Sequence, residues 1–351
     1  MSQNYENSAY SLNYIFEHKD PYLVFLNLAA SKDLINQNQS NYLGQKDTTL
    51  TRNHNIQLTF YSPSKKDFSY VVGYEHEKQK VNYSSFGTHF QKNTNTTSFL
   101  IENKIKIKNN LVRIHLRLSN HDSYGFNKSW NIGYKKNLNQ QWVLRFNNGS
   151  AFRSPNSSEL YGYGSNENLN PEISMGQEFG VEKITDDSIF SLVAFNNKIK
   201  DLINFDFKAN ILKNIERSTI QGLEVRYIWE NKTINGRLLL RYQNPKDDLG
   251  LQLLRRSKKS LSVNMYKDLS LGTLNLNLSA FDKRRDFGNL PLPKYHLIHL
   301  SFLKEISNQI SISIRLENLF DKEYFTASGF NGYYQNQGRS LWLNATYEIQ
   351  Q

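Results

Sequence analysis

The sequence predicts an all-β fold in which antiparallel strands form a transmembrane barrel. Apolar and polar residues alternate with a period of two along many segments, as they do over 339–349 at the C-terminus. Such a segment has one apolar face and one polar face, the pattern of a strand with lipid on one side and water on the other. Short polar turns also alternate with long connections, and an outer-membrane barrel has short turns at one rim and long loops at the other. The strands of a soluble sandwich also alternate apolar and polar residues. That fold does not require short and long connections to alternate, so we prefer the membrane barrel.

The alternating segments predict about seventeen strands of roughly ten residues each. In one of them, Val112, Ile114, Leu116 and Leu118 share a face that Arg113 does not. Before a long loop we expect strands at 8–17, 21–31, 51–62, 67–78, 95–106, 109–119, 127–137 and 140–149. After it we expect 173–183, 188–205, 216–230, 233–243, 257–267, 270–283, 293–304, 308–319 and 339–349.

The connections between these strands are of two kinds. The short ones are tight and polar, at 17–20, 62–66, 106–110, 185–187, 230–232 and 305–308. The long ones are expected at 32–50, 79–94, 150–172, 244–256 and 321–338. The long loops are therefore where we expect ligand contacts, because loops carried on a rigid wall commonly supply binding residues.

Composition narrows the class of protein further. The 351 residues include 13% aromatic residues and no Cys, which excludes a disordered chain, a disulfide scaffold and thiolate metal sites. No run approaches the ~20 apolar residues of a membrane-spanning helix. The charge of +11, from 43 Lys and Arg against 32 Asp and Glu, suits an anionic lipid surface or a nucleic acid. No recognition helix or RNA-binding motif accompanies that charge, so we expect no nucleic-acid partner.

Three motifs carry information beyond this periodicity. The first is Ala-Phe-Arg-Ser-Pro-Asn-Ser-Ser-Glu-Leu-Tyr-Gly at 151–162, followed by Asn-Leu-Asn-Pro-Glu at 168–172. The second is Ile-Gln-Gly-Leu-Glu at 220–224, where Gly222 suggests a bulge or a close backbone approach. The third is Glu-Asn-Leu-Phe-Asp-Lys-Glu-Tyr at 317–324, in which Asn318 is expected to be structural. In order and spacing, these motifs resemble the C-terminal barrel of the TonB-dependent outer-membrane receptors.

Within that family, the chain most closely resembles the vitamin B12 (cobalamin) receptors. The resemblance implies a barrel of about 22 strands closed by an N-terminal plug. Residues 1–351 would form a single domain, the C-terminal portion of that barrel, without the plug and the first strands. It also implies a monomer in the cell outer membrane, in contact with lipopolysaccharide and other outer-membrane lipid. TonB would act through the missing plug, and cobalamin or another large scarce nutrient would be the ligand.

The same resemblance implies three substrate-binding residues, Thr49, Arg255 and Phe287. An arginine here can hold phosphate or amide oxygens with its fixed set of donors, although a loop cation facing lipopolysaccharide explains Arg255 equally well. Two further aromatic side chains, Tyr161 and Tyr163, can stack on a planar ligand.

Searches for other chemistry find little, so we expect no metal, no cofactor and no enzymatic activity. The His residues are scattered, and no phosphate-binding loop or nucleophile elbow is present. Three alternatives remain open: a siderophore receptor of the same family, an outer-membrane enzyme using His299 and Ser301, and a non-functional split-gene fragment. Haem is disfavoured because residues 153–172 contain no His.

Overall fold

In the computed structural model of the chain, the described residues are 2–17, 22–39, 45–63, 67–85, 87–162, 164–206, 209–329 and 332–348. The chain divides into two compact units. The first unit consists of Met1–Lys136, Phe146–Gln177 and Lys198–Arg217, and the second of Asn137–Arg145, Glu178–Asn197 and Ser218–Gln351.

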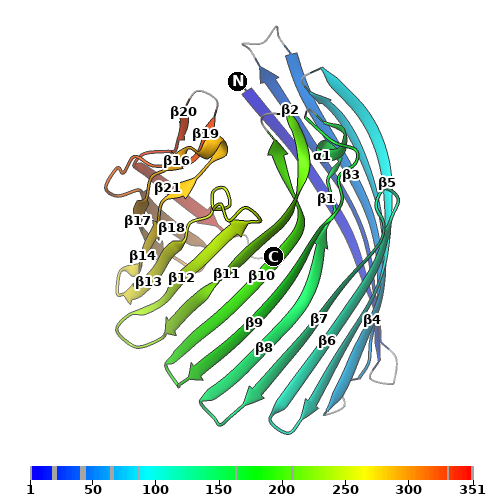
Figure 1. Cartoon of the computed structure of the whole chain (residues 1–351). Helices are drawn as coiled ribbons and strands as arrows, with labels where there is room; N and C mark the ends of the chain where they lie inside the picture. The colour runs from blue at the N-terminus through cyan, green and yellow to red at the C-terminus, as the bar shows by residue number, and fades with distance from the viewer. Residues whose placement is uncertain are drawn as a thin grey trace. The chain divides into compact units, whose positions relative to one another are not determined.

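Within these described ranges the fold is all-β, as predicted, and seventeen strands belong to the main sheet. Consecutive strands pair antiparallel, and Figure 1 shows this for β5, β6 and β7, which lie side by side. The strands of the sheet are β1 (Ser2–Glu17), β2 (Leu23–Gln39), β3 (Gln45–Tyr61), β4 (Phe68–Ser85), β5 (Thr88–Ile107), β6 (Asn110–His121), β7 (Gly125–Asn137), β8 (Trp142–Arg153), β9 (Glu172–Ile184), β10 (Ser188–Asp206), β11 (Ile211–Trp229), β12 (Asn235–Asp247), β13 (Lys259–Leu269), β14 (Gly272–Phe281), β17 (Tyr295–Glu305), β18 (Ile310–Glu317) and β21 (Ser340–Tyr347).

Small elements occupy the long connections. Two short hairpins pair β15 with β16 and β19 with β20. Their bounds, and those of the two helical turns, are β15 (Arg284–Arg285), β16 (Pro291–Leu292), β19 (Phe325–Gly329), β20 (Gly332–Gln335), α1 (Ser157–Tyr161) and the 3-10 turn η1 (Phe287–Asn289). None of the helices in the described part of the chain has the length and apolar character needed to cross a membrane.

The prediction of long loops at 32–50 and 79–94 is wrong. Strands β2 and β3 extend through most of the first, and β4 and β5 extend through most of the second. These extensions are rich in polar residues and carry only scattered apolar ones, such as Leu34 and Val81, so no sustained apolar alternation marks them in the sequence. Their backbones pair across the hairpin nonetheless, and side chains add further hydrogen bonds, such as Thr48 Oγ1 to Asn36 Oδ1 at 3.0 Å.

The strands of the first unit expose their apolar face and bury their polar face. One row of register partners across β1 to β6 consists of Phe16, Val24, Phe60, Val72, Ile101 and Leu116. Large side chains on this face are open, with Val72 42% and Ile101 44% exposed. On the other face, Ser98 and Ser119 are only 1% and 3% exposed. A soluble protein buries its apolar face, so the reversal marks a wall with lipid outside.

The polar face of the first unit is held by hydrogen bonds between strands. Arg117 in β6 donates from Nη2 to Glu75 Oε2 in β4 at 2.7 Å and to Ser98 Oγ in β5 at 3.0 Å. Ser98 and Ser119 are joined at 2.8 Å between their hydroxyl oxygens. Many polar groups of this face therefore meet a partner on a neighbouring strand, although the buried hydroxyl of Thr59 forms no hydrogen bond within the described residues.

The second unit repeats the arrangement. Val225, Leu240, Leu261 and Ala280 are register partners across β11 to β14 and form its apolar face. Gly222 lies in β11, where the register with β12 continues without a shift. A Cβ atom at this position would collide with the carbonyl oxygen of Tyr242. The predicted close backbone approach is therefore confirmed, and no bulge interrupts the pairing of β11 with β12 at this position.

Candidate ligand-binding rim

Two of the three predicted binding residues meet in the loops of the second unit. Arg255, between β12 and β13, stands in the left-handed region with φ of 57°. Its backbone N–H donates to the carbonyl of Arg285 at 2.7 Å, which ties this loop to the one between β14 and β17. The guanidinium of Arg255 then lies over the ring of Phe287, 5.0 Å from its centroid. The pair forms a cation–π contact at the rim.

Asp286 is the residue that joins them, and the sequence analysis missed it. Its carboxylate is fully buried and accepts from Arg255 Nε at 2.8 Å, from the N–H of Phe287 at 2.9 Å and from the N–H of Ser328 at 2.6 Å. Burial alone raises the pKa of a carboxyl group, but these donors outweigh burial and lower the pKa of Asp286. The carboxylate is therefore ionised at neutral pH and holds the guanidinium in place. We call Arg255, Asp286 and Phe287 the rim clasp.

Further bonds fix the loops around the rim clasp. The guanidinium of Arg284, itself 7% exposed, donates to the carbonyls of Phe325 at 2.9 Å and of Pro293 at 3.3 Å. Tyr333 in β20 donates its hydroxyl to the carbonyl of Pro291 at 2.8 Å. The hairpin β19–β20 is thus bonded to the loop that carries Asp286, so the rim clasp is preorganised.

The rim clasp leaves donors available to a ligand. Within the described residues, the two terminal nitrogens of Arg255 make no hydrogen bond, and its side chain is 44% exposed. An arginine fixed through Nε presents those terminal nitrogens in one plane, which suits phosphate or amide oxygens. The site can bind and orient a ligand, but it holds no nucleophile or proton-transfer pair.

Thr49, the third predicted residue, belongs to the first unit. It lies in β3, opposite Ile35 in β2 and Tyr83 in β4. The ring of Tyr83 stacks on that of Phe90 with centroids 4.9 Å apart, and Phe90 contacts Tyr161 at 5.6 Å. Thr49 therefore lies beside an aromatic cluster of the first unit, whereas the rim clasp belongs to the second unit.

Tyr161, which we expected to stack on ligand, contacts other side chains of the protein. Besides Phe90, it contacts the Nζ atom of Lys92, which lies 4.1 Å from its ring centroid. The other aromatic side chain, Tyr163, lies outside the described residues.

Side chains of the first sequence motif fix the loop between β8 and β9. Arg153 pairs with Glu159 at 2.9 Å and with Glu172 at 2.6 Å. Asn156 caps α1, and the Glu159 carboxylate accepts a hydrogen bond from the Asn156 N–H at 2.8 Å. The conspicuous residues of the motif are therefore bonded to one another, and the cap fixes the start of the helix.

His299 and Ser301 were the two residues considered for an outer-membrane enzyme. Within the described residues, no hydrogen bond joins their side chains. His299 Nδ1 accepts the backbone N–H of Asn318 at 3.3 Å, and the Asn318 side chain bonds both backbone groups of Lys322 at 2.9 Å. Asn318 is therefore structural, as expected. Ser301 faces Asn275 and Arg315 in the register. Over the described part of the chain, no group of three or more side chains is arranged to hold a metal ion.

A strand wall with an exposed apolar face, short turns and preorganised long loops defines an outer-membrane β-barrel protein. Residues 2–319 match the family model described as TonB dependent receptor-like, beta-barrel. The chain therefore belongs to the TonB-dependent receptor β-barrel family, a family of outer-membrane receptors and transporters rather than enzymes.

Relatives and solved structures agree on this fold. The chain is 26% identical over 242 residues to the vitamin B12 transporter BtuB of Vibrio vulnificus, covering 67% of this chain and 39% of that protein. It is 28% identical over 250 residues to BtuB of Photobacterium profundum, covering 67% and 40%. The siderophore receptor PirA of Acinetobacter baumannii superposes with a TM-score of 0.81 at 18% identity, over 98% of this chain and 62% of that one. The ferric enterobactin receptor PfeA of Pseudomonas aeruginosa gives 0.78 at 17% over the same shares.

Proposed function

We propose that this chain supplies the barrel wall of a TonB-dependent receptor that takes up cobalamin across the outer membrane. The rim clasp is the observation that carries the proposal. Arg255 is fixed by a buried carboxylate and an aromatic ring, and it keeps terminal donors for the amide and phosphate oxygens of a corrinoid. Similarity to vitamin B12 transporters supports the same ligand.

The proposed mechanism contains no bond-making step. The rim binds ligand, and TonB, acting on a plug domain, would open a path along the polar face of the wall. That face is lined by paired side chains such as Glu75 and Arg117, so it can stay wet while the other face contacts lipid. The chain spans about 40% of the length of the vitamin B12 transporters that it matches, so transport by the whole receptor is part of this proposal.

Direct titration tests the proposal. Refolded full-length chain is titrated with cyanocobalamin and, separately, with ferric enterobactin, and tryptophan fluorescence reports binding. We expect cyanocobalamin to bind and Arg255→Ala to weaken that binding about tenfold, since a charged hydrogen bond contributes about 1.5 kcal/mol.

Arg256→Ala is the matched control, because Arg256 is adjacent, is exposed and belongs to the same loop. Binding that is unchanged in Arg255→Ala would refute the role of the rim clasp. Binding of ferric enterobactin in place of cyanocobalamin would assign the receptor to siderophores.

A further inference from the structure

Four cationic side chains gather at one end of β5, β6 and β7 in the first unit. Lys104 in β5 is the register partner of Arg113 in β6. In the adjacent row, Leu111 in β6 lies between Lys106 in β5 and Lys135 in β7. Lys104, Lys106 and Arg113 are exposed, and Lys135 is half-buried. We call Lys104, Lys106, Arg113 and Lys135 the basic cluster.

The basic cluster lies on the polar face of the wall. Side chains of a strand alternate between its two faces. The two lysines in β5 are an even number of residues from Ser98, and Arg113 is an even number from Ser119, with no shift in the register of β5 with β6. In β7, Lys135 is opposite Leu111, which shares the face of Arg113. All four cations therefore point away from the lipid-facing side.

The acids beside the basic cluster do not pair with it in the part of the chain that the structure describes. Glu102 precedes Lys104 by two residues, but its Oε2 atom lies 3.5 Å from Nδ1 of His115. Asp67 accepts the backbone N–H of Lys106 through its carbonyl at 2.7 Å, and its carboxylate makes no ion pair with that lysine. None of the four cationic side chains forms an ion pair or a hydrogen bond with a described residue.

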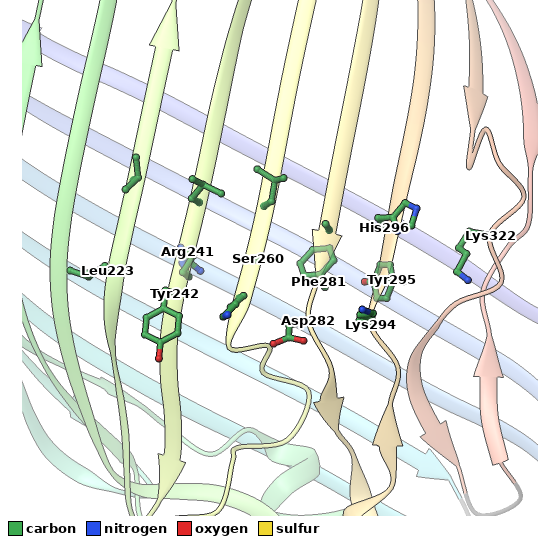
Figure 2. A pocket seen from close by; sticks show the side chains of 15 residues that line it. Leu223, Arg241, Tyr242, Ser260, Phe281, Asp282, Lys294, Tyr295, His296 and Lys322 are labelled. Carbon is green, nitrogen blue, oxygen red and sulfur yellow. The ribbon is translucent and has the colours of Figure 1, made fainter.

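Two other arginines of the wall show the usual arrangement. In the first unit, Arg117 lies further along β6 and pairs with Glu75 at 2.7 Å. In the second unit, Arg241, labelled in Figure 2 among the residues around a hollow, pairs with Glu224 at 2.6 Å. The basic cluster differs from both in having its charges uncompensated.

The arrangement of these charges is unfavourable unless an anion joins them. Register partners such as Lys104 and Arg113 have Cα atoms about 5 Å apart, and like charges in such a pair destabilise a sheet. Gly133 in β7 follows Arg113 in the same row and has no side chain, so space remains beside the guanidinium. A guanidinium binds phosphate oxygens with paired donors, and an ammonium adds a point charge. The facing pair therefore has the chemistry of a phosphate site.

The basic cluster lies at the periplasmic end of the wall. It adjoins the short turn between β5 and β6, whereas the polar extensions over 79–94 lie at the other end of β5. Short turns of an outer-membrane barrel face the periplasm, and long connections face the outside. The cations are therefore placed where a ligand that has followed the polar face leaves it.

From this arrangement we propose that the basic cluster is an exit site that binds the phosphate group of the nutrient as it leaves the barrel. Lys104 and Arg113 hold the phosphate oxygens, and Lys106 and Lys135 add positive charge around them. The cluster spans only three strands, about 10 Å, which suits one small anionic group better than an acidic polypeptide. The identity of the nutrient rests on the proposed function, whereas the anion chemistry rests on the cluster alone.

The test compares two double variants of the full-length chain refolded in detergent. Lys104→Gln/Arg113→Gln removes the facing pair and is the cluster variant. Lys108→Gln/Lys136→Gln is the matched control, because it removes two exposed cations at the same end of the wall, one in the turn after β5 and one on the other face of β7. Urea unfolding followed by circular dichroism measures stability. The cluster variant should be at least as stable as the wild type, because its two cations repel each other, whereas a structural role would make it less stable.

Each protein is titrated by calorimetry with pyrophosphate, with a glutamate-rich peptide, with cyanocobalamin and with cobinamide, a corrinoid that lacks the phosphate. We expect the cluster variant to bind pyrophosphate about tenfold more weakly than the wild type, and the control variant to bind it as the wild type does. Cyanocobalamin should show a second binding event that cobinamide lacks. That event should disappear in the cluster variant and persist in Arg255→Ala, which changes the rim clasp only.

Three results would overturn the proposal. They are equal losses of pyrophosphate binding in the two double variants, a second binding event that cobinamide shares, and tighter binding of the glutamate-rich peptide than of pyrophosphate at the cluster. If pyrophosphate binding depends on the cluster but cyanocobalamin does not bind at all, the proposed function fails and the anion site stands. If the cluster variant does not fold, Lys106→Gln/Lys135→Gln must by itself weaken pyrophosphate binding severalfold.

Discussion

Two clusters in the second unit each pair a buried carboxylate with arginine, but they differ in their role. In the wall, Glu182 is buried to 6% exposure and pairs with Arg145 at 2.7 Å and with Arg226 at 3.4 Å. In the loops, Asp286 is buried and pairs with a single arginine, Arg255. The acid of the wall cluster, in β9, is shared by two cations, Arg145 in β8 and Arg226 in β11, so it links three strands of the sheet. The acid of the rim clasp is otherwise saturated by backbone N–H groups, so it orients one cation toward solvent.

The comparison teaches that a buried acid does not by itself indicate function. The two clusters differ in the direction in which the arginine donors point. They also differ in the other groups that donate hydrogen bonds to the acid, which are a second arginine in the wall and backbone N–H groups in the rim clasp. Breaking either pair leaves a buried charge without compensation, which is costly in both places. Only in the rim clasp should the change also remove a binding surface.

The largest effect is expected for Asp286→Ala. The substitution leaves Arg255 Nε and the N–H groups of Phe287 and Ser328 without an acceptor, so we expect the loop to lose about 3 kcal/mol of stability. Limited proteolysis of the folded protein should show faster cleavage between β14 and β17, together with loss of cyanocobalamin binding. Asp248→Ala, which changes an exposed loop acid, should alter neither. A variant that retains both loop protection and ligand affinity would contradict the role given to Asp286.

Glu182→Gln should weaken the wall without changing ligand affinity in the protein that remains folded. The amide keeps an acceptor but removes the charge between Arg145 and Arg226, so we expect a loss of about 2 kcal/mol in the free energy of unfolding. Urea titration in detergent measures that loss.

The matched control for the wall cluster is Glu224→Gln. Glu224 pairs with Arg241 at 2.6 Å, but the glutamate side chain is 27% exposed, against 8% for Glu182. We expect less than about 1 kcal/mol there, because solvent screens an exposed pair. Equal losses for Glu182→Gln and Glu224→Gln would show that burial does not set the strength of these wall contacts.

The smallest effect concerns pH. Because the pKa of Asp286 is lower in the folded protein than in the unfolded chain, its contribution to stability is fully present above the unfolded value of about 3.9. That contribution is lost only as the pH falls through the lower, folded value. Protease protection of the loop between β14 and β17 should therefore be the same at pH 7 and pH 5. Protection that disappears between these two pH values would mean that another group controls the loop.

Much of the fold could be predicted from the sequence. The alternation at 112–118 and over 339–349 specified strands because the side chains of a strand point to opposite faces. The error at 79–94 has the same origin, since polar residues dominate this stretch and its few apolar ones, such as Val81 and Phe90, form no sustained alternation. Arg255 and Phe287 were predicted through a family resemblance, whereas Asp286 was not, because neither periodicity nor the quoted motifs mark it.

By itself, the sequence determined that this protein is a wall of antiparallel strands with one lipid-facing side, because local alternation and connection length are properties of consecutive residues. Only the tertiary structure decided which charges meet. Arg255 and Asp286 are 31 residues apart, and Arg117 and Glu75 are 42 apart. Whether such residues pair depends on strand register and loop packing, and one residue of slip would turn every side chain of a strand to the other face.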